Sequence, residues 1–134
     1  IIAAKDTMNY YCLNNVIILQ VKKKEMIDFI LGLLNSNLLR WVYRNLTQEK
    51  NRVFAEVKPV NLRKLPIRII KESDPIFGEI VRNVNSIIEL KKEYTSSMSN
   101  INENLKKLIK DLNNQVYKLY DLSNDEIKII ESSL

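Results

Sequence analysis

The chain of 134 residues has no histidine, one cysteine and two glycines. The absence of histidine excludes the usual general base, the Ser-His and Cys-His nucleophile pairs and most zinc sites. The lone Cys12 cannot form an internal disulfide, so nothing argues for secretion. Gly32 and Gly78 stand far apart, which excludes a glycine-rich phosphate loop. The longest apolar stretch, at 29–34, is far shorter than the ~18 residues of a membrane span, so we expect a soluble protein with almost no catalytic equipment.

The composition is otherwise that of an ordinary globular domain. Hydrophobic residues make up 46% of the chain and charged residues 28%, which provides enough apolar surface for a core. The first residues are Ile1 and Ile2, with neither an initiator methionine nor the features of a signal peptide. We therefore expect the C-terminal piece of a larger protein, performing one step of the parent's task.

Positive charge is concentrated in the first half of the chain. Residues 1–72 contain 13 Lys and Arg against 6 Asp and Glu, whereas residues 73–134 contain 8 against 10. The chain is rich in Ile, Asn and Lys, a bias that AT-rich codons would produce, so arginine is the more informative residue. All six arginines fall between Arg40 and Arg82. This pattern predicts a surface that binds a polyanion by displacing counterions from phosphates, with a merely solvated face as the alternative.

The first 73 residues combine patterns of both strands and helices. Aromatic and β-branched residues at 8–21 predict one bent strand or two short ones, and the alternation at 53–58 predicts another strand. Apolar residues recur every three or four positions at 25–34 and 38–46, which predicts two helical segments with Ser36 capping the second. A polar loop is expected at 47–52 and a short extended segment at 67–70.

The remainder of the chain has helical patterns only. Asp74 and Pro75 supply an N-cap and a proline at the first helical position. Apolar stripes at 77–91 and 101–119 predict an antiparallel helical hairpin, and Ser123 and Glu126 form a capping-box pattern before a last short helix. The predicted fold class is α+β: a small mixed α/β recognition domain at 1–73, followed by an antiparallel helical hairpin and a short C-terminal helix at 74–134.

One pair of residues has a spacing known from catalysis. Glu56 and Lys58 have the E-x-K spacing of a metal-dependent nuclease strand, but such a site also requires an upstream aspartate, usually in a Pro-Asp turn, which the chain lacks. Alternation along a half-exposed strand explains the pair equally well. The six tyrosines have no adjacent base, and we expect most to pack with a solvated hydroxyl. We therefore expect no catalytic residue and no metal ligand in this chain.

Three blocks, in this order and spacing, resemble one known family. They are YCLNN at 11–15 with LNSNL at 34–38, FAEVK at 54–58 with LPI at 65–67, and VYKLY at 116–120 with EIKIIE at 126–131. Over nearly the whole chain they resemble the TaqI-like C-terminal specificity domain, the target-recognition region of Type IIG restriction–modification enzymes. Two positions depart from the family pattern, because Asp121 stands where glycine is usual and Asn113 where an acidic residue is common.

The resemblance implies a division of labour within a larger enzyme that fuses nuclease, adenine-N6 DNA methyltransferase and DNA recognition. The catalytic domain flips an adenine out of the duplex, and the specificity domain grips the major-groove side. The Asn-Pro-Pro-Tyr-type motif of the methyltransferase is absent from this chain, so S-adenosylmethionine and Mg²⁺ are expected in the parent and no cofactor is expected here. The implied partners are double-stranded DNA and the upstream methyltransferase and nuclease domains, in the cytoplasm of a bacterium or archaeon and without a membrane.

The arginine-rich region 40–68 fits this role because Arg is the commonest bidentate reader of guanine, and Asn or Gln of adenine. The candidate base readers lie in the polar loop and are Gln48, Lys50, Asn51 and Arg52. The candidate phosphate contacts are Arg40, Arg44, Arg63, Lys64 and Arg68. Arg82 is expected to pair within its helix, near Glu79, rather than to contact DNA.

Two alternative functions are compatible with the sequence. The target-recognition half of a Type I restriction specificity subunit would use 75–119 as a long spacer helix that pairs with another such spacer. A helical protein-interaction module would have no DNA role, and its basic region would only be solvated. The length of one unbroken helix distinguishes the Type I alternative from a hairpin folded against its own recognition domain.

Overall fold

The structure is a computed structural model that describes residues 1–13, 16–47, 57–93 and 101–134. Its helices are α1 (Met26–Leu34), α2 (Asn37–Thr47), α3 (Pro59–Leu62), α4 (Pro75–Glu93), α5 (Ile101–Leu119) and α6 (Asn124–Ser132). No strand occurs within the described ranges. None of the helices there combines the length and the apolar character needed to cross a membrane.

The predicted α+β fold class is therefore wrong. The described parts of 8–21 and all of 67–70 have no regular structure. In the strand predicted at 53–58, residues 53–56 lie outside the described residues. Strand propensity reflects how well a side chain fits a pleated, half-buried sheet surface, so it has no effect without a partner strand. Here the side chains of Val21, Ile67 and Ile70 are partly buried and pack individually against the helical core.

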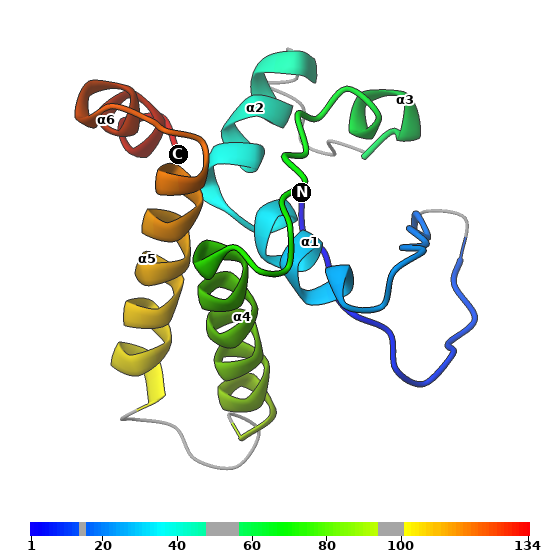
Figure 1. The fold of residues 1–134 in the computed structure, drawn as a ribbon. Coiled ribbons are helices and arrows are strands. Elements are labelled where there is room, and N and C mark those ends of the chain that lie inside the picture. The colour runs from blue at the N-terminus through cyan, green and yellow to red at the C-terminus, as the bar shows by residue number, and fades with distance from the viewer. Residues whose placement is uncertain (14–15, 48–56, 94–100) are drawn as a thin grey trace.

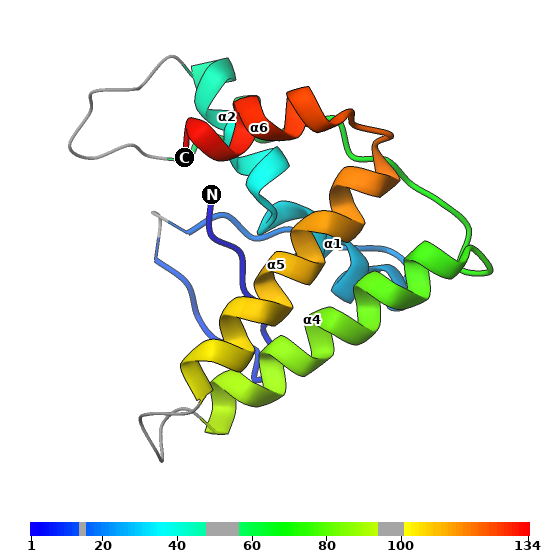
Figure 2. The ribbon, with the colours of Figure 1, turned by 90° about the vertical axis from the view of Figure 1, so that its left-hand side faces the viewer.

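The core lies where α1 packs on the pair formed by α4 and α5. These two long helices run antiparallel and side by side, with α1 against them (Figures 1 and 2). The rings of Phe29 and Phe77 stack with centroids 5.0 Å apart, which joins α1 to the first turn of α4. The predicted division at residues 73 and 74 stays a prediction, and the core extends across it.

Helix ends follow the local rules that the sequence suggested. The Asp74 carboxylate accepts a hydrogen bond from the Ile76 N–H at 3.0 Å, directly before Pro75 begins α4. Between α1 and α2 the buried Ser36 hydroxyl donates to the Leu33 carbonyl at 2.7 Å and accepts from the Leu39 N–H at 3.3 Å. The Ser36 side chain thus supplies a hydrogen-bond partner to a carbonyl at the end of α1 and to an N–H at the start of α2.

The last helix is held against α5 and α2 by polar contacts. The Tyr117 hydroxyl on α5 donates a short hydrogen bond to the Glu131 carboxylate on α6. Burial and this contact with Glu131 raise the pKa of Tyr117 well above its usual value. Asn37, at the start of α2, donates its side-chain amide to Glu131 at 3.1 Å and its backbone N–H to Asn113 at 2.8 Å. The acidic residue expected at 113 is therefore replaced by an amide that still accepts this bond.

Candidate nucleic-acid interface

The basic side chains predicted to contact phosphates come from separate elements and do not all point the same way. Arg40 and Arg44 belong to α2 itself, whereas Arg63 and Lys64 follow α3, and all four are exposed. Helices α3 and α6 lie on opposite sides of α2 (Figure 1). The Arg44 guanidinium donates to the Ser133 carbonyl at 3.1 Å, so it reaches toward the end of α6 and away from α3. The predicted set therefore does not form one group.

Arg40 lies close to Ile1. Arg40 and Arg44 therefore face the first and the last residues of the described chain, although their side chains remain open to solvent. They are less well placed than Arg63 and Lys64 to form one continuous surface with the residues around α3.

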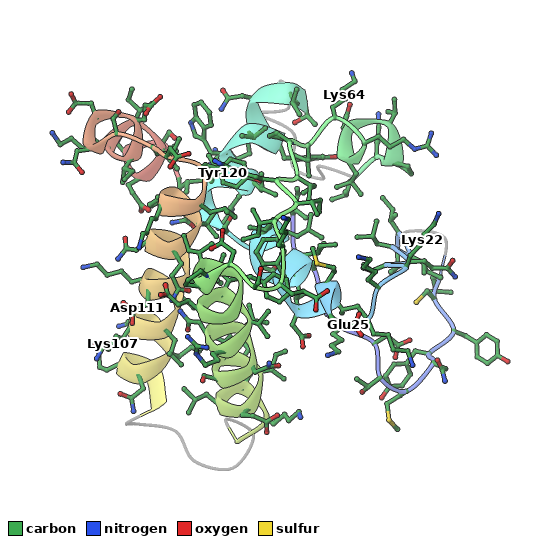
Figure 3. All side chains as sticks on the ribbon, in the orientation of Figure 1. Lys22, Glu25, Lys64, Lys107, Asp111 and Tyr120 are labelled. Atoms are coloured by element: carbon green, nitrogen blue, oxygen red, sulfur yellow. The ribbon has the colours of Figure 1, made fainter. Side chains whose placement is uncertain are left out.

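Arg63 and Lys64 sit on a short turn whose backbone is fixed from within. Pro59 occupies the first turn of α3, where its ring fixes the backbone angle φ in a helical value. Its carbonyl accepts a hydrogen bond from the Arg63 N–H at 3.1 Å. The buried Leu65 anchors the turn in the core directly after the two basic residues. Lys64 points away from the body of the molecule (Figure 3). Neither side chain forms an ion pair with any residue that the structure describes, so both charges are available to a ligand.

The entrance to this turn is fastened to α2. The Lys58 N–H, one residue before α3, donates to the Tyr43 hydroxyl at 3.0 Å, and Tyr43 itself is buried in α2. Two of the tyrosines for which the sequence offered no partner therefore have structural roles, Tyr43 here and Tyr120 at the other end of the same segment.

Arg68 is engaged within the molecule. Its guanidinium donates to the Leu119 carbonyl at 2.5 Å and pairs with the Asp121 carboxylate at 2.9 Å, at the C-terminal end of α5. Its backbone N–H donates to the Tyr120 hydroxyl at 3.1 Å, and that hydroxyl donates to the Pro66 carbonyl at 2.5 Å. Burial raises the pKa of the Tyr120 hydroxyl, and the contacts with Arg68 oppose this shift. The main visible role of Arg68 is therefore to tie the segment after α3 to α5.

A second basic feature, which the sequence did not predict as a site, lies beside the start of α1. Lys23 and Lys71 line one hollow of about 430 Å³ together with Met26, Ile69, Ile70 and Glu72. Lys23 belongs to the run Lys22–Lys24 that leads into α1, and Lys22 is exposed on this segment (Figure 3). The lysine run can be seen in the sequence, directly after the strand segment predicted at 8–21. Its closeness to Lys71 had no sequence signal, because tertiary folding brings the two segments together.

A polar hollow of about 440 Å³ runs between α4 and α5. It is lined by the carboxylates of Glu79 and Asp111, by Arg82, and by the polar residues Asn83, Ser86, Asn114 and Gln115, with Leu108. Arg82 and Glu79 both line this hollow, but the pair expected between them does not form among the residues described. The buried Asn83 donates to Gln115 at 3.3 Å, and its own amide oxygen has no hydrogen-bond partner among the residues described. Arg82 therefore lines a hollow of the α4–α5 hairpin and does not belong to the turn after α3 that carries Arg63 and Lys64.

The four candidate base readers, Gln48, Lys50, Asn51 and Arg52, lie outside the described residues, as does Glu56 of the E-x-K pair. Their assignment stays a prediction from sequence. The described residues hold no group of three or more Cys, Asp or Glu side chains suited to a metal ion. We derive no step through Mg²⁺ or S-adenosylmethionine on this chain, and their expected place is the parent's catalytic domains.

Comparison with known proteins gave one finding. A family model described as the TaqI-like C-terminal specificity domain matches residues 1–67, which is half of the chain and includes α1, α2, α3, Arg63 and Lys64. No curated protein and no solved structure matches the chain significantly.

Proposed function

Because the chain belongs to the family of TaqI-like C-terminal specificity domains, we propose that it binds double-stranded DNA and selects the sequence on which the catalytic domains of a Type IIG restriction–modification enzyme act. A specificity domain is not itself catalytic. The parent enzyme would supply the nuclease, the adenine-N6 methyltransferase, S-adenosylmethionine and Mg²⁺.

The observation that carries the proposal is the pair of free cationic side chains after α3. Arg63 and Lys64 are exposed, lie on a fixed turn and form no ion pair within the described chain. Lys23 and Lys71 add two more positive charges around one hollow. Such groups suit phosphate, since each contact releases condensed counterions from the DNA. Gln48, Lys50, Asn51 and Arg52 are proposed as base readers on sequence grounds alone.

The arrangement of the long helices supports the Type IIG reading over a Type I specificity subunit. Type I spacers would place 75–119 in a helix that extends away and pairs with another spacer. Here α4 ends at Glu93, α5 begins at Ile101, and the two run antiparallel against α1 (Figures 1 and 2). A hairpin that packs on its own recognition portion is what the Type IIG architecture requires.

A salt titration of duplex binding tests the proposal. If four to six phosphates are neutralised, the logarithm of the affinity should fall with the logarithm of salt concentration at a slope of about −4 to −5. Arg63→Ala combined with Lys64→Ala should make this slope shallower by about 2, because two phosphate contacts are lost, and should weaken all sequences about equally.

The matched control removes the same charge elsewhere. Lys106→Ala with Lys128→Ala deletes two cations that are paired with Glu103 and Asp125 on α5 and α6. This control should leave the slope unchanged. A flat salt response of the unchanged protein, or equal slopes for the two double variants, would contradict the proposed surface.

A further inference from the structure

Large apolar side chains are concentrated and exposed in the segment before α1. Within the described residues 8–13 and 16–19 these side chains are Met8, Tyr10, Tyr11, Leu13, Val16, Ile18 and Leu19. Tyr11 is completely exposed, and Met8 and Tyr10 are each 69% exposed. Single exposed apolar residues are common in soluble proteins, but this many within one short segment mark a surface that another molecule covers.

The segment is presented by a fixed base. The Ala3 backbone and the Asn35 side chain exchange two hydrogen bonds of 3.0 Å, and the Lys5 ammonium pairs with Asp28 at 2.7 Å. Both contacts hold the outgoing leg on α1, while the returning leg runs directly into that helix. Figure 1 shows the segment running out from α1 and back again, away from α4 and α5. The apolar side chains are therefore carried on a projection whose base is anchored to the core.

The surroundings of this projection indicate the chemistry of its partner. The returning leg carries Lys22, Lys23 and Lys24, and Lys23 lines the same hollow as Lys71, so the projection is continuous with the proposed DNA surface. A partner must offer negative charge to the lysines and flat apolar faces to the tyrosines. Double-stranded DNA offers both, because phosphates flank a stack of bases, and apolar side chains enter such stacks in many proteins that bend DNA.

We propose that residues 8–13 and 16–19 form an apolar wedge that enters the base stack of double-stranded DNA. Tyr10 and Tyr11 stack against the separated bases, and Lys22, Lys23 and Lys24 hold the neighbouring phosphates. The inference rests on the proposed function and adds to it a local unwinding of the bound duplex. It assigns this action to a part of the chain that the charge pattern alone would not select.

Closure of a nicked plasmid by DNA ligase in the presence of the protein measures this unwinding without knowledge of the target sequence. The unchanged protein should shift the linking number of the closed circles. Tyr10→Ala with Tyr11→Ala should abolish the shift and lower duplex affinity about tenfold, the scale of losing one or two stacked bases, at an unchanged salt slope. Tyr10→Phe with Tyr11→Phe keeps both rings and should retain the shift.

The control variant is Ile109→Ala with Ile129→Ala. It removes two exposed apolar side chains, 41% and 57% exposed, on α5 and α6, which carry no residue of the proposed DNA surface, and should behave like the unchanged protein. If the tyrosine variants bind and unwind normally while Arg63→Ala with Lys64→Ala changes the salt slope, the wedge is overturned and the proposed function stands. Binding without any shift in linking number also overturns the wedge. If the unchanged protein binds no duplex, the proposed function fails, and the wedge with it.

Discussion

At the residue scale, Asp121 explains how this chain departs from its family pattern without losing the turn. Its φ of 55° lies in the left-handed region, where glycine is favoured. The Asp121 N–H donates to the Lys118 carbonyl and the Leu122 N–H to the Tyr117 carbonyl, each at 3.1 Å, which is the Schellman arrangement at a helix C-terminus. Aspartate is tolerated there because its short polar side chain suits this conformation, and its carboxylate also pairs with Arg68.

Substitution of Asp121 separates the backbone effect from the ion pair. Asp121→Gly should be about 1 kcal/mol more stable than Asp121→Ala, because only the alanine suffers the left-handed penalty. Asp121→Asn tolerates this conformation but removes the charge, and should stay within about 1 kcal/mol of the unchanged protein because the pair is half exposed. Urea unfolding measures both differences, and equal stabilities of the glycine and alanine variants would contradict the assignment of strain.

Residue roles were also the hardest part to predict from sequence. Arginine-rich composition pointed to Arg63 and Arg68 alike, yet Arg63 is free within the described chain and Arg68 is bound to the end of α5. Their difference depends on partners more than 50 positions away in the sequence, which no local pattern encodes. Most of the tyrosines were expected to carry a solvated hydroxyl, but the Tyr120 hydroxyl bonds the backbone on both sides of Ile67.

At the scale of the helix, the two glycines have opposite roles. A Cβ on Gly32 would lie 2.8 Å from Val84 and 3.0 Å from Ile80, so this glycine permits the close approach of α1 to α4. A Cβ on Gly78 would meet only the flexible guanidinium of Arg82, at 3.1 Å.

Gly32→Ala should therefore destabilise the protein by about 1–3 kcal/mol through overpacking, despite the better helix propensity of alanine. Gly78→Ala is the matched control and should stabilise it by about 0.5–1 kcal/mol, since propensity acts there without a steric cost. Thermal unfolding of the two variants gives the comparison. Stabilisation by Gly32→Ala would show that α1 and α4 are not in tight contact.

The start of α6 offers a pH-dependent test of a capping box that the sequence predicted and the structure confirms. The Glu126 carboxylate accepts a hydrogen bond from the Ser123 N–H at 2.8 Å and a second one from the Ser123 hydroxyl. Both bonds lower the pKa of Glu126 below its ordinary 4.5, and the backbone bond contributes more. The carboxylate therefore stabilises α6 above pH 4.5, and this contribution is lost as the pH falls through the lowered pKa.

Hydrogen exchange of α6 amides should accelerate on acidification through that range, and Glu126→Gln should remove this response. The control Asp125→Asn deletes a neighbouring carboxylate and leaves both capping bonds in place. A proton titration of Glu126 by NMR gives its pKa directly, and a value at or above 4.5 would be incompatible with the capping role.

Helices were more predictable than strands for a physical reason. The apolar period of three and four residues and the caps at Asp74, Ser36 and Ser123 are local, and α1, α2, α4, α5 and α6 occupy the segments that carry them. A strand depends on a neighbour that its own sequence does not specify, so the β-branched residues at 16–18 were misleading.

At the scale of the whole molecule, the uneven charge corresponds to a division between a helical support and a basic surface. The hairpin of α4 and α5 carries most of the core contacts with α1, whereas the cations of the proposed DNA surface lie after α3 and before α1 (Figures 1 and 3). The sequence predicted this asymmetry. It did not predict that Arg40 and Arg44 would face the termini, because the side of α2 that each residue occupies is set by the packing of α3 and α6.

The turn that carries Arg63 and Lys64 is held at both ends, by Tyr43 at Lys58 and by Tyr120 at Pro66 and Arg68. Ordering a loop upon association lowers affinity, since backbone and side-chain freedom must be given up at that moment. In this protein most of that loss of backbone freedom occurs during folding. The turn that presents the Arg63 guanidinium and the Lys64 ammonium is therefore already ordered before a ligand binds.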